Sequence, residues 1–317
     1  MPTRRWLAAG LVLALLAPAR AQEPKPARLE WKFEKDKAFY QTLTTETTRT
    51  LKISGKDVTR KDTQTYVLKW TPTKQEDKNW ALKLKIEGVR IDSDLPDGGK
   101  TSFDSAKPDG ASGRLADLYR ALTGPDVELT ITVNAEMQAT DVDGTAKLVE
   151  QLGKADPQLE GMLNQVLSRD NLKQIADAAF PALPNKEVKK GDTWSRTSVS
   201  SITPLGTFKT TATYTDDGPG KDANVETIGV KAETTYEAPA SQGIGFPFKI
   251  NSATLKSTEG SGTVTFRKDR GRAEKSELKV TLAGKLNMDV SGTATEVEVT
   301  QTTTKTVTTS DENPAKK

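Results

Sequence analysis

Pairs of carboxylates are the residues of this chain whose type and spacing come closest to a catalytic device. Glycosidase-like chemistry uses two carboxyl groups and needs neither His nor Cys. The chain contains no His and no Cys, so it lacks the side chain most used for proton transfer at neutral pH. The candidate pairs are Asp92 with Asp94, Asp141 with Asp143, and Asp216 with Asp217. All three pairs fall at expected strand ends or turns, where Asp is common for its local hydrogen bonds, so we assign no catalytic residue.

One acidic segment has part of the spacing of a calcium-binding loop. Asp141, Asp143, Gly144 and Glu150 match its third, fifth, sixth and twelfth positions. Ala139 stands at the first position, where the loop depends on a carboxylate. Asp141, Asp143 and Glu150 are therefore a weak calcium candidate, and the alternative is a strand end, a turn and a helix start with acids near the helix N-terminus. We expect no metal and no cofactor.

Aromatic and basic residues supply two further candidates for binding. Trp70 and Trp80 are in phase with the apolar residues of their segments, so we expect them in the core and not stacked on a sugar. Four basic residues gather around one turn, and we interpret them as a solvated turn in preference to a site for an anionic partner: Arg267, Lys268, Arg270 and Arg272.

The first residues have the form of a cleavable signal peptide. Arg4 and Arg5 precede an apolar run over residues 7–17, and Ala19-Arg20-Ala21 is a small-residue cleavage site. The apolar run is too short for a membrane-spanning helix, which needs about 20 residues. We therefore expect a signal peptide over 1–21, no transmembrane anchor after cleavage, and an exported protein, either periplasmic or secreted.

Charge argues against nucleic acid as a partner. The chain has 46 basic and 43 acidic residues, and Arg4, Arg5 and Arg20 would leave with the signal peptide, making the two numbers equal. Phosphate binding needs a surplus of Lys and Arg on one face, and here the two signs alternate. The absence of Cys also means that the core must hold an exported fold without disulfides.

Alternation of apolar and polar residues predicts many half-buried strands. It is clearest over residues 127–139 and 278–290, where every second residue is apolar or Gly. From Trp80 to Ile86 the same pattern holds, and after Gly88 the apolar phase slips by one residue, which predicts a β-bulge. One polar face favours antiparallel pairing.

Between the strand-rich parts, the apolar period becomes helical. We expect helices from Ser112 to Leu122 and from Thr145 to Phe180, the latter including starts at Asp156-Pro157 and Asp170. Short amphipathic helices need an apolar surface to cover, and the dry face of the sheet is the obvious one. A ligand held between sheet and helices would meet four residues: Met162, Leu163, Leu167 and Phe180.

Two motifs carry a resemblance to a known family. They are Asp141-Val-Asp143-Gly144 at the end of an alternating segment, and residues 184–195, which read PNKEVKKGDTWS. With them, the chain from about Leu29 to Thr309 resembles an uncharacterised family of exported bacterial β-rich proteins, a domain of unknown function. The resemblance implies no activity, cofactor or catalytic residue. The order of strands and central helices is also distantly similar in architecture to periplasmic lipoprotein carriers, whose curved sheet cups a hydrophobic ligand.

The fold class expected is α+β and mainly β, with long curved antiparallel sheets and a central insertion of short amphipathic helices. The domain organisation is a signal peptide over 1–21, a β-rich domain over 22–309 and a disordered tail over 310–317. As an alternative, the β-rich domain divides into sub-domains at about 28–142 and 192–309, joined by a helical segment over 145–181.

The function favoured from the sequence is a non-enzymatic cell-envelope protein that binds a lipid or another apolar or amphipathic ligand between sheet and helices. The first alternative is a structural or protein-interaction module with a solid core, whose partner is an envelope protein. The second alternative is a carboxylate-based hydrolase.

Overall fold

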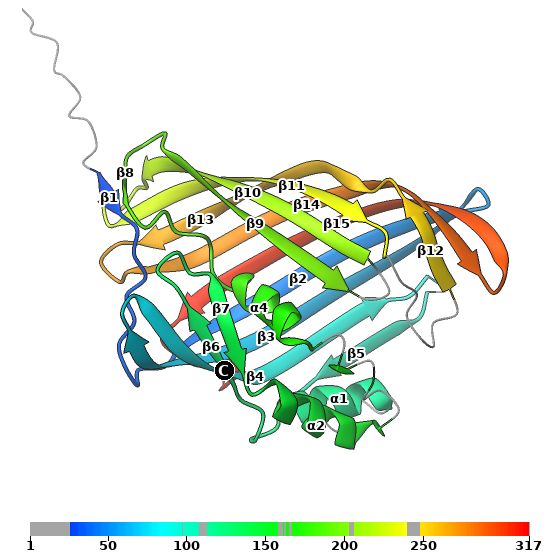
Figure 1. The fold of residues 1–317 in the computed structure, drawn as a ribbon, viewed down its shortest axis with the longest axis horizontal. Coiled ribbons are helices and arrows are strands. Elements are labelled where there is room, and N and C mark those ends of the chain that lie inside the picture. Colours follow the sequence, from blue (N-terminus) through cyan, green and yellow to red (C-terminus); the bar gives the residue numbers. More distant parts are fainter. Residues whose placement is uncertain are drawn as a thin grey trace, which may run out of the picture.

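The structure is a computed structural model that describes residues 26–96, 98–107, 113–157, 161, 163–164, 167–202, 206–239 and 248–316. The expected signal peptide, residues 1–21, lies outside these ranges. Strands account for most of the described chain (Figure 1). They are β1 (Ala27–Arg28), β2 (Phe39–Ile53), β3 (Lys56–Glu76), β4 (Asn79–Asp94), β5 (Lys100–Asp104), β6 (Leu129–Val133), β7 (Ala139–Asp143), β8 (Glu187–Val188), β9 (Thr193–Ile202), β10 (Gly206–Pro219), β11 (Val225–Glu237), β12 (Phe248–Ala253), β13 (Lys256–Arg267), β14 (Arg272–Val290) and β15 (Thr293–Ser310).

All strands but β1 and β8 belong to one antiparallel sheet, which has 13 strands within the described chain. Its order is β7-β6-β4-β3-β2-β15-β14-β13-β11-β10-β9, with β12 beside β14 and β5 beside β4. Because β2 pairs with β15 along its whole length, strands from residues 28–142 and from 192–309 share this sheet. The antiparallel, mainly β class expected from the alternation is confirmed.

Tight turns join the longest strands. Ser54-Gly55 connects β2 to β3 and Ser291-Gly292 connects β14 to β15, and all four residues have positive φ angles of 50° to 84°. Two-residue turns of this kind match the twist of antiparallel strands. They fix the register of the long hairpins at their tips.

The expected slip at Gly88 is confirmed. Val67 pairs with Gly88 whereas Leu68 pairs with Ile86, so one residue of β4 is unpaired at this bulge. The bulge brings Val89 and Ile91 into a second apolar cluster with Phe103 and Ala116.

The alternating segment over residues 127–139 does not form one strand, as its pattern suggested. It forms the β6–β7 hairpin, whose turn is made by the Asn134 side chain: Oδ1 accepts hydrogen bonds from the backbone N–H groups of Glu136 and Gln138, at 3.1 and 2.9 Å. Met137 takes a positive φ of 59° in this turn. An Asx turn reverses the chain without interrupting the apolar alternation, which is why the pattern concealed it.

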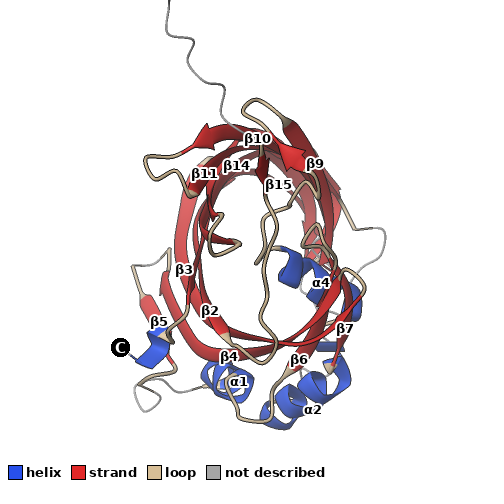
Figure 2. Ribbon diagram, turned by 90° about the vertical axis from the view of Figure 1, so that its left-hand side faces the viewer, coloured by secondary structure: helices blue, strands red, loops and turns tan. Residues whose placement is uncertain are grey.

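The sheet curls so that its two edge strands, β7 and β9, approach each other, and one helix lies between them (Figure 2). The helices are α1 (Arg114–Leu122), α2 (Thr145–Ala155) and α4 (Arg169–Asp177), with a short 3-10 helix η3 (Pro314–Lys316). Helix α4 contacts both edge strands, and α1 and α2 contact each other beside β4 and β6 (Figures 1 and 2). The face of the sheet that looks toward α4 is called the inner face below.

The helix starts differ in detail from those expected. Ser168 caps α4 by accepting a hydrogen bond from the Asn171 N–H, and Asp170 lies inside the first turn. Asp156 directly follows α2. The helix expected to start at Asp156-Pro157 continues into residues 158–160, which lie outside the described ranges, as does Ser112. Ser is a good N-cap because its hydroxyl accepts a hydrogen bond from a free backbone N–H. Capping by Ser168, two residues before Asp170, is therefore physically equivalent to the cap expected at Asp170.

The C-terminal segment is also more closely attached than a disordered tail. Asp311 forms two hydrogen bonds with Arg272, and Asn313 Nδ2 donates to Glu87 at 3.3 Å. These contacts hold residues 311–313 against the sheet. The polar composition of the segment suggested a solvated tail, but the ion pair with the buried guanidinium of Arg272 fixes its position.

The principal core fills one end of the curled sheet. Trp70, Leu82, Ile131, Val142 and Ile228 are completely buried there. A third apolar cluster, centred on Tyr236, Leu255, Val297 and Val299, lies separate from it. The cavity described next borders the principal core, because Phe180, Val230 and Val264 belong both to that core and to the cavity lining.

Candidate functional site

Helix α4 and the residues that follow it are fastened to both edges of the sheet by polar contacts. On the β7 side, Arg169 donates to the Val142 carbonyl at 2.9 Å and pairs with Asp141 at 2.7 Å, and Asp177 Oδ1 accepts from the Ala139 N–H at 2.5 Å. On the β9 side, Arg196 donates to the carbonyls of Phe180 and Glu136. The helix therefore closes the gap that the sheet leaves open.

A cavity of about 180 Å³ lies between α4 and the inner face. Apolar and polar side chains contribute to its lining in similar numbers. The apolar members include Phe180, Ala212, Val230, Val264, Leu278 and Val307. The polar members include Gln174, Asp177, Arg196, Ser198, Thr210, Tyr214, Ser276 and Lys305.

The polar groups of this lining without a hydrogen-bond or ion-pair partner among the described residues include two that bear on ligand binding. One is the Oε1 atom of Gln174, which is buried. The other is the ammonium of Lys305, whose side chain is only partly exposed. Burial lowers the pKa of Lys305 to about 8, and desolvation is the only cause of that shift.

The other charged groups of the cavity are already engaged. Burial raises the pKa of Asp177, and the hydrogen bond from Ala139 together with the charges of Arg196 and Lys173 opposes that rise. Burial lowers the pKa of Arg196, whereas Tyr214, Asp177 and Glu136 oppose that effect. Lys305 is thus the cation of this lining whose charge is not balanced.

Of the four residues expected from the sequence to bind a ligand, one lines the cavity. Phe180 lines the cavity and is 3 % exposed. Leu163 is buried in the principal core, and Leu167 packs against that core; neither lines the cavity. Met162 lies outside the described residues.

Lys305 was not singled out from the sequence, although a signal for it exists. In β15 it shares its phase with Val297, Val299 and Val307, which are all buried. Strand residues two apart point to the same face, so a Lys in that phase had to face the interior. The long run of Thr residues around it concealed the apolar phase.

The weak calcium candidate is not assembled. Asp141 pairs with Arg169, Asp143 Oδ1 accepts from the Gly144 N–H, and Glu150 pairs with Lys154. Within the described ranges, no three acidic side chains gather in a group that could hold a metal ion.

The carboxylate pairs do not form catalytic dyads either. Asp92 pairs with Arg90 and Asp94 with Lys100. Asp216 is buried whereas Asp217 is exposed, because adjacent strand residues point to opposite faces. Asp216 instead lies beside the buried Glu226, and burial together with Asp216 raises the pKa of Glu226 against the opposing effect of Lys268.

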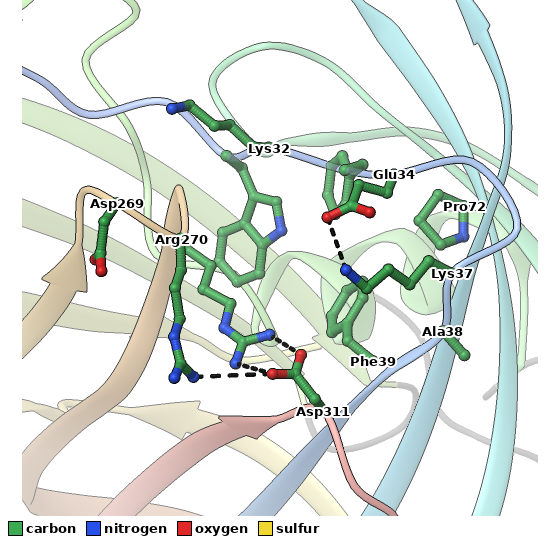
Figure 3. Close-up of a pocket in the computed structure, with 12 residues that line it drawn as sticks. Lys32, Glu34, Lys37, Ala38, Phe39, Pro72, Asp269, Arg270 and Asp311 are labelled. Carbon is green, nitrogen blue, oxygen red and sulfur yellow. Dashed lines mark hydrogen bonds and ion pairs between the residues drawn. The ribbon is translucent and has the colours of Figure 1, made fainter.

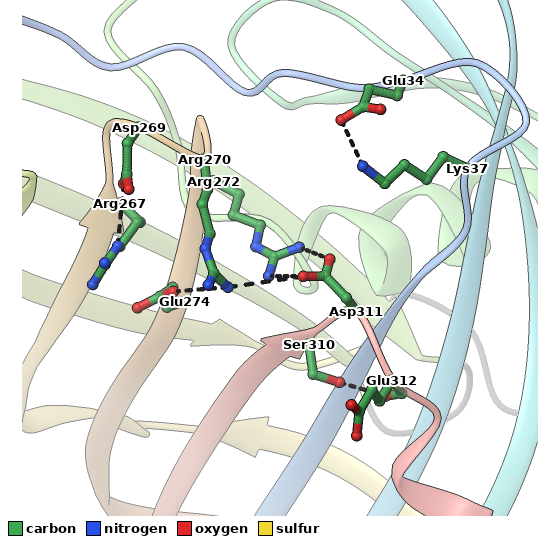
Figure 4. A network of polar contacts seen from close by, with 10 residues as sticks. All are labelled: Glu34, Lys37, Arg267, Asp269, Arg270, Arg272, Glu274, Ser310, Asp311 and Glu312. Carbon is green, nitrogen blue, oxygen red and sulfur yellow. Dashed lines mark hydrogen bonds and ion pairs between the residues drawn. The ribbon is translucent and has the colours of Figure 1, made fainter.

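A second cavity, of about 490 Å³, lies at the end of the sheet where residues 31–39 cross it (Figure 3). Its walls are mostly charged, and most of these charges are paired. Lys37 pairs with Glu34 at 2.8 Å, and Asp311 binds the guanidinium of Arg272 (Figure 4). The apolar part of the lining includes Trp31, Phe33 and Phe39.

The basic cluster around residue 270 is neutralised by the chain itself (Figure 4). Arg267 pairs with Asp222 and Asp269, and Arg270 lies within 4 Å of both Glu274 and Asp311. Lys268 Nζ lies 2.6 Å from the Glu226 carboxylate. The cluster therefore presents no surplus of positive charge to a partner.

The tryptophans are structural, as expected. Trp70 is fully buried and its ring lies 5.0 Å from that of Phe180. Trp80 packs against Phe33, and Trp194 stacks on Tyr214 while its Nε1 donates to the Ala182 carbonyl at 2.9 Å.

The fold and the cavity define a class: a mainly β protein whose curled antiparallel sheet is closed by a short helix over a partly apolar cavity. The chain belongs to a family of unknown function, DUF6263, whose match extends over residues 77–289. This region includes α4 and strands β4 to β13. No curated protein matches the chain.

Solved structures show only distant likeness. A structure described as lipid–protein interactions in lipovitellin aligns with 86 % of this chain and 25 % of that chain, at 10 % identity and a TM-score of 0.40. The chain thus spans about a quarter of that protein. The structure of DynF from the dynemicin biosynthesis pathway of Micromonospora chersina aligns with 94 % of this chain and 92 % of its own, at 9 % identity and a TM-score of 0.22. At these scores the likenesses define neither a shared fold nor a shared function.

Among the residues that the structure describes, no helix has both the length and the apolar character required to cross a membrane.

Proposed function

We propose that this protein is an exported, non-enzymatic binding protein of the cell envelope that holds an apolar or amphipathic ligand between α4 and the inner face of the sheet. The observation that carries the proposal is the cavity of about 180 Å³ beneath α4. A fully packed interior would leave no space there, since protein cores contain few voids larger than a water molecule.

The lining suits a ligand that is mainly apolar. Phe180, Val264 and Leu278 offer apolar surface to its interior. Burial of apolar area is worth roughly 25 cal/mol per Å², so even a small ligand gains binding free energy from these walls. The few hydroxyl and amide groups of the lining provide orientation.

Helix α4 is the element that suits entry and release. It has only nine residues, and isolated helices of that length are marginal in water. Its position therefore depends on its contacts with β7 and β9. Loss of the contacts made by Arg169 or Arg196 would free the helix without disturbing the pairing of the long strands.

Native mass spectrometry of the protein, purified from its own cells without detergent, tests the binding proposal. We expect an additional mass that is released by solvent extraction. Ala212→Leu places a larger side chain in the cavity and should abolish this mass, whereas Ala294→Leu, at an exposed position of β15, should retain it. A bare protein mass, together with the absence of binding by added apolar probes, would disprove the proposal.

Export is tested separately. N-terminal sequencing of the protein from its own cells should give Gln22 as the first residue, because the cleavage site ends at Ala21. Recovery of a chain that still begins at Met1 would contradict export by signal cleavage and leave the cavity unaffected.

A second candidate function is a protein-interaction module, and the edge strand β9 favours it. β9 is the last strand of the sheet, and Val199 on it is 43 % exposed. Unpaired edges with exposed apolar residues invite addition of a strand from a partner. Val199→Lys should abolish such pairing with an envelope protein while leaving cavity binding intact.

A further inference from the structure

We propose that the cavity under α4 selects ligands with an anionic carboxylate head group, which pairs with the ammonium of Lys305. This inference rests on the proposed binding function and names the class of ligand. The inference is based on the position of one unpaired cation, Lys305, beside the apolar side chains of the cavity lining.

The strand register places Lys305 on the inner face. Lys305 pairs with Leu278 of β14 and with Thr45 of β2. Leu278 and Lys305 both line the cavity, as does Val307, two residues further along β15. The tight turn fixes the register of the long β14–β15 hairpin, so the side chain of Lys305 must point to the inner face.

Among the residues that the structure describes, no carboxylate pairs with this ammonium. The cavity lining includes two acids, Asp177 and Glu277. Asp177 accepts the hydrogen bond of the Ala139 N–H. Glu277 follows Ser276 on the strand, so its exposed side chain points to the outer face, where it pairs with Lys275.

The remaining titratable groups around the cavity do not supply a counter-charge. Arg196 is itself a cation, and its guanidinium is occupied by two backbone carbonyls. Tyr214 stacks on Trp194. An anion entering the cavity would therefore meet an uncompensated ammonium.

Partial burial of an ammonium without a partner is costly to the fold. The lowered pKa of Lys305, about 8, reflects this cost. An anionic ligand would supply the missing ion pair. The charged form of Lys305 would then be stabilised in the cavity. The hydroxyl of Ser276, in the same lining, can donate a further hydrogen bond to the head group.

The volume limits the ligand. An engineered cavity of about 150 Å³ binds benzene, so the cavity of about 180 Å³ accepts a short chain or a small ring. Gln174, Asp177 and Ser198 line both this cavity and a groove between α4 and β9, which gives a longer chain a path outward. A medium-chain carboxylic acid fits this description.

Isothermal titration of the purified protein with three probes tests the inference: octanoate, 1-octanol and octylammonium, which share a tail and differ in head group. We expect octanoate to bind at least about tenfold more tightly than 1-octanol, since a hydrogen bond to a charged group contributes about 1.5–3 kcal/mol. Octylammonium should bind more weakly than 1-octanol.

Lys305→Met removes the charge and keeps the length of the side chain. In this variant, octanoate should lose its advantage over 1-octanol while 1-octanol binds as before. Lys231→Met, on the exposed face of β11, is the matched control and should retain the advantage.

The outcomes distinguish the two proposals. Equal affinities of octanoate and 1-octanol in the unaltered protein, or an octanoate preference that survives Lys305→Met, would overturn the carboxylate inference and leave the binding function standing. Failure of all three probes to bind would count against the binding function itself, and against the inference with it.

Discussion

The indole ring of Trp31 lies edge-on to the phenyl ring of Phe180, with centroids 5.1 Å apart and planes at 83°. Trp31 lines the charged cavity at the end of the sheet, and Phe180 lines the cavity under α4. The two rings, with Trp70 behind Phe180, therefore form the partition between the two spaces. The same contact anchors the chain that follows α4 to the N-terminal segment.

Phe180→Ala should destabilise the protein by about 3–5 kcal/mol, the usual cost of removing a buried phenyl ring. The ring is 3 % exposed and contacts two tryptophans, so little can move in to replace it. Urea unfolding measures the change. The side chain of Ile175 on α4 is 53 % exposed. Ile175→Ala is therefore the control and should change stability by less than about 0.5 kcal/mol. Equal effects of the two substitutions would contradict the partition.

Lys305→Met should raise the melting temperature of the unliganded protein, and the gain should depend on pH. Burial lowers the pKa of Lys305 from 10.5 to about 8, so the unfolded chain binds more protons between these values. The unaltered protein therefore gains stability as pH rises through this window, and the variant does not. The difference should be largest below pH 8 and should shrink toward pH 10.5. A difference independent of pH would show that Lys305 does not lose its proton in the fold.

Glu226→Gln should change the acid side of the stability profile. Burial, and then the neighbouring Asp216, raise the pKa of Glu226 above its ordinary value of 4.5. The folded protein then holds the proton to higher pH than the unfolded chain, so stability falls as pH rises from 4.5 through the raised pKa. The amide of the variant has no proton to lose in this range, so the variant should lack this fall in urea unfolding at a series of pH values. Glu233→Gln, exposed on the same strand, should retain it.

Gly260→Ala should destabilise the sheet, because a β-carbon at Gly260 would overlap the carbonyl oxygen of Ala232. The pairing of β11 with β13 is interrupted between Lys231 and Thr235, where the two backbones come close. Overpacking of this kind costs about 1–3 kcal/mol, measurable by thermal unfolding. At Gly161 an added β-carbon meets nothing within 4 Å, so Gly161→Ala should not destabilise. A tolerated Gly260→Ala would show that the two backbones can separate there.

The strands could be predicted because alternation is a local property. The alternation of Trp80, Leu82 and Ile86 predicted β4, and the phase slip at Gly88 predicted its bulge. The β6–β7 turn could not be found in the same way, since Asn134 reverses the chain without breaking the alternation. The cap of α4 at Ser168 was missed because several Ser and Asp residues near a helix start can cap equally well.

The candidate site was foreseen only in part. Phe180 was expected to meet a ligand because it belongs to the apolar stripe of an expected amphipathic helix, and it lines the cavity. Lys305 was overlooked because its environment is made by α4, β11 and β14, which are far from it in the sequence. The carboxylate pairs do not form catalytic dyads, for two different reasons. Asp216 and Asp217 are adjacent strand residues and point to opposite faces, which is a local property. Asp141 pairs with Arg169 of α4, which is a tertiary contact.

The sequence by itself determined the antiparallel β class, the bulge at Gly88 and the short central helices, because side-chain periodicity depends on neighbours along the chain. Only the tertiary structure decided that β2 pairs with β15, that α4 closes the gap between β7 and β9, and that Lys305 faces a cavity without a counter-charge. These features depend on contacts between segments that are distant in the sequence, and on the desolvation that such contacts impose.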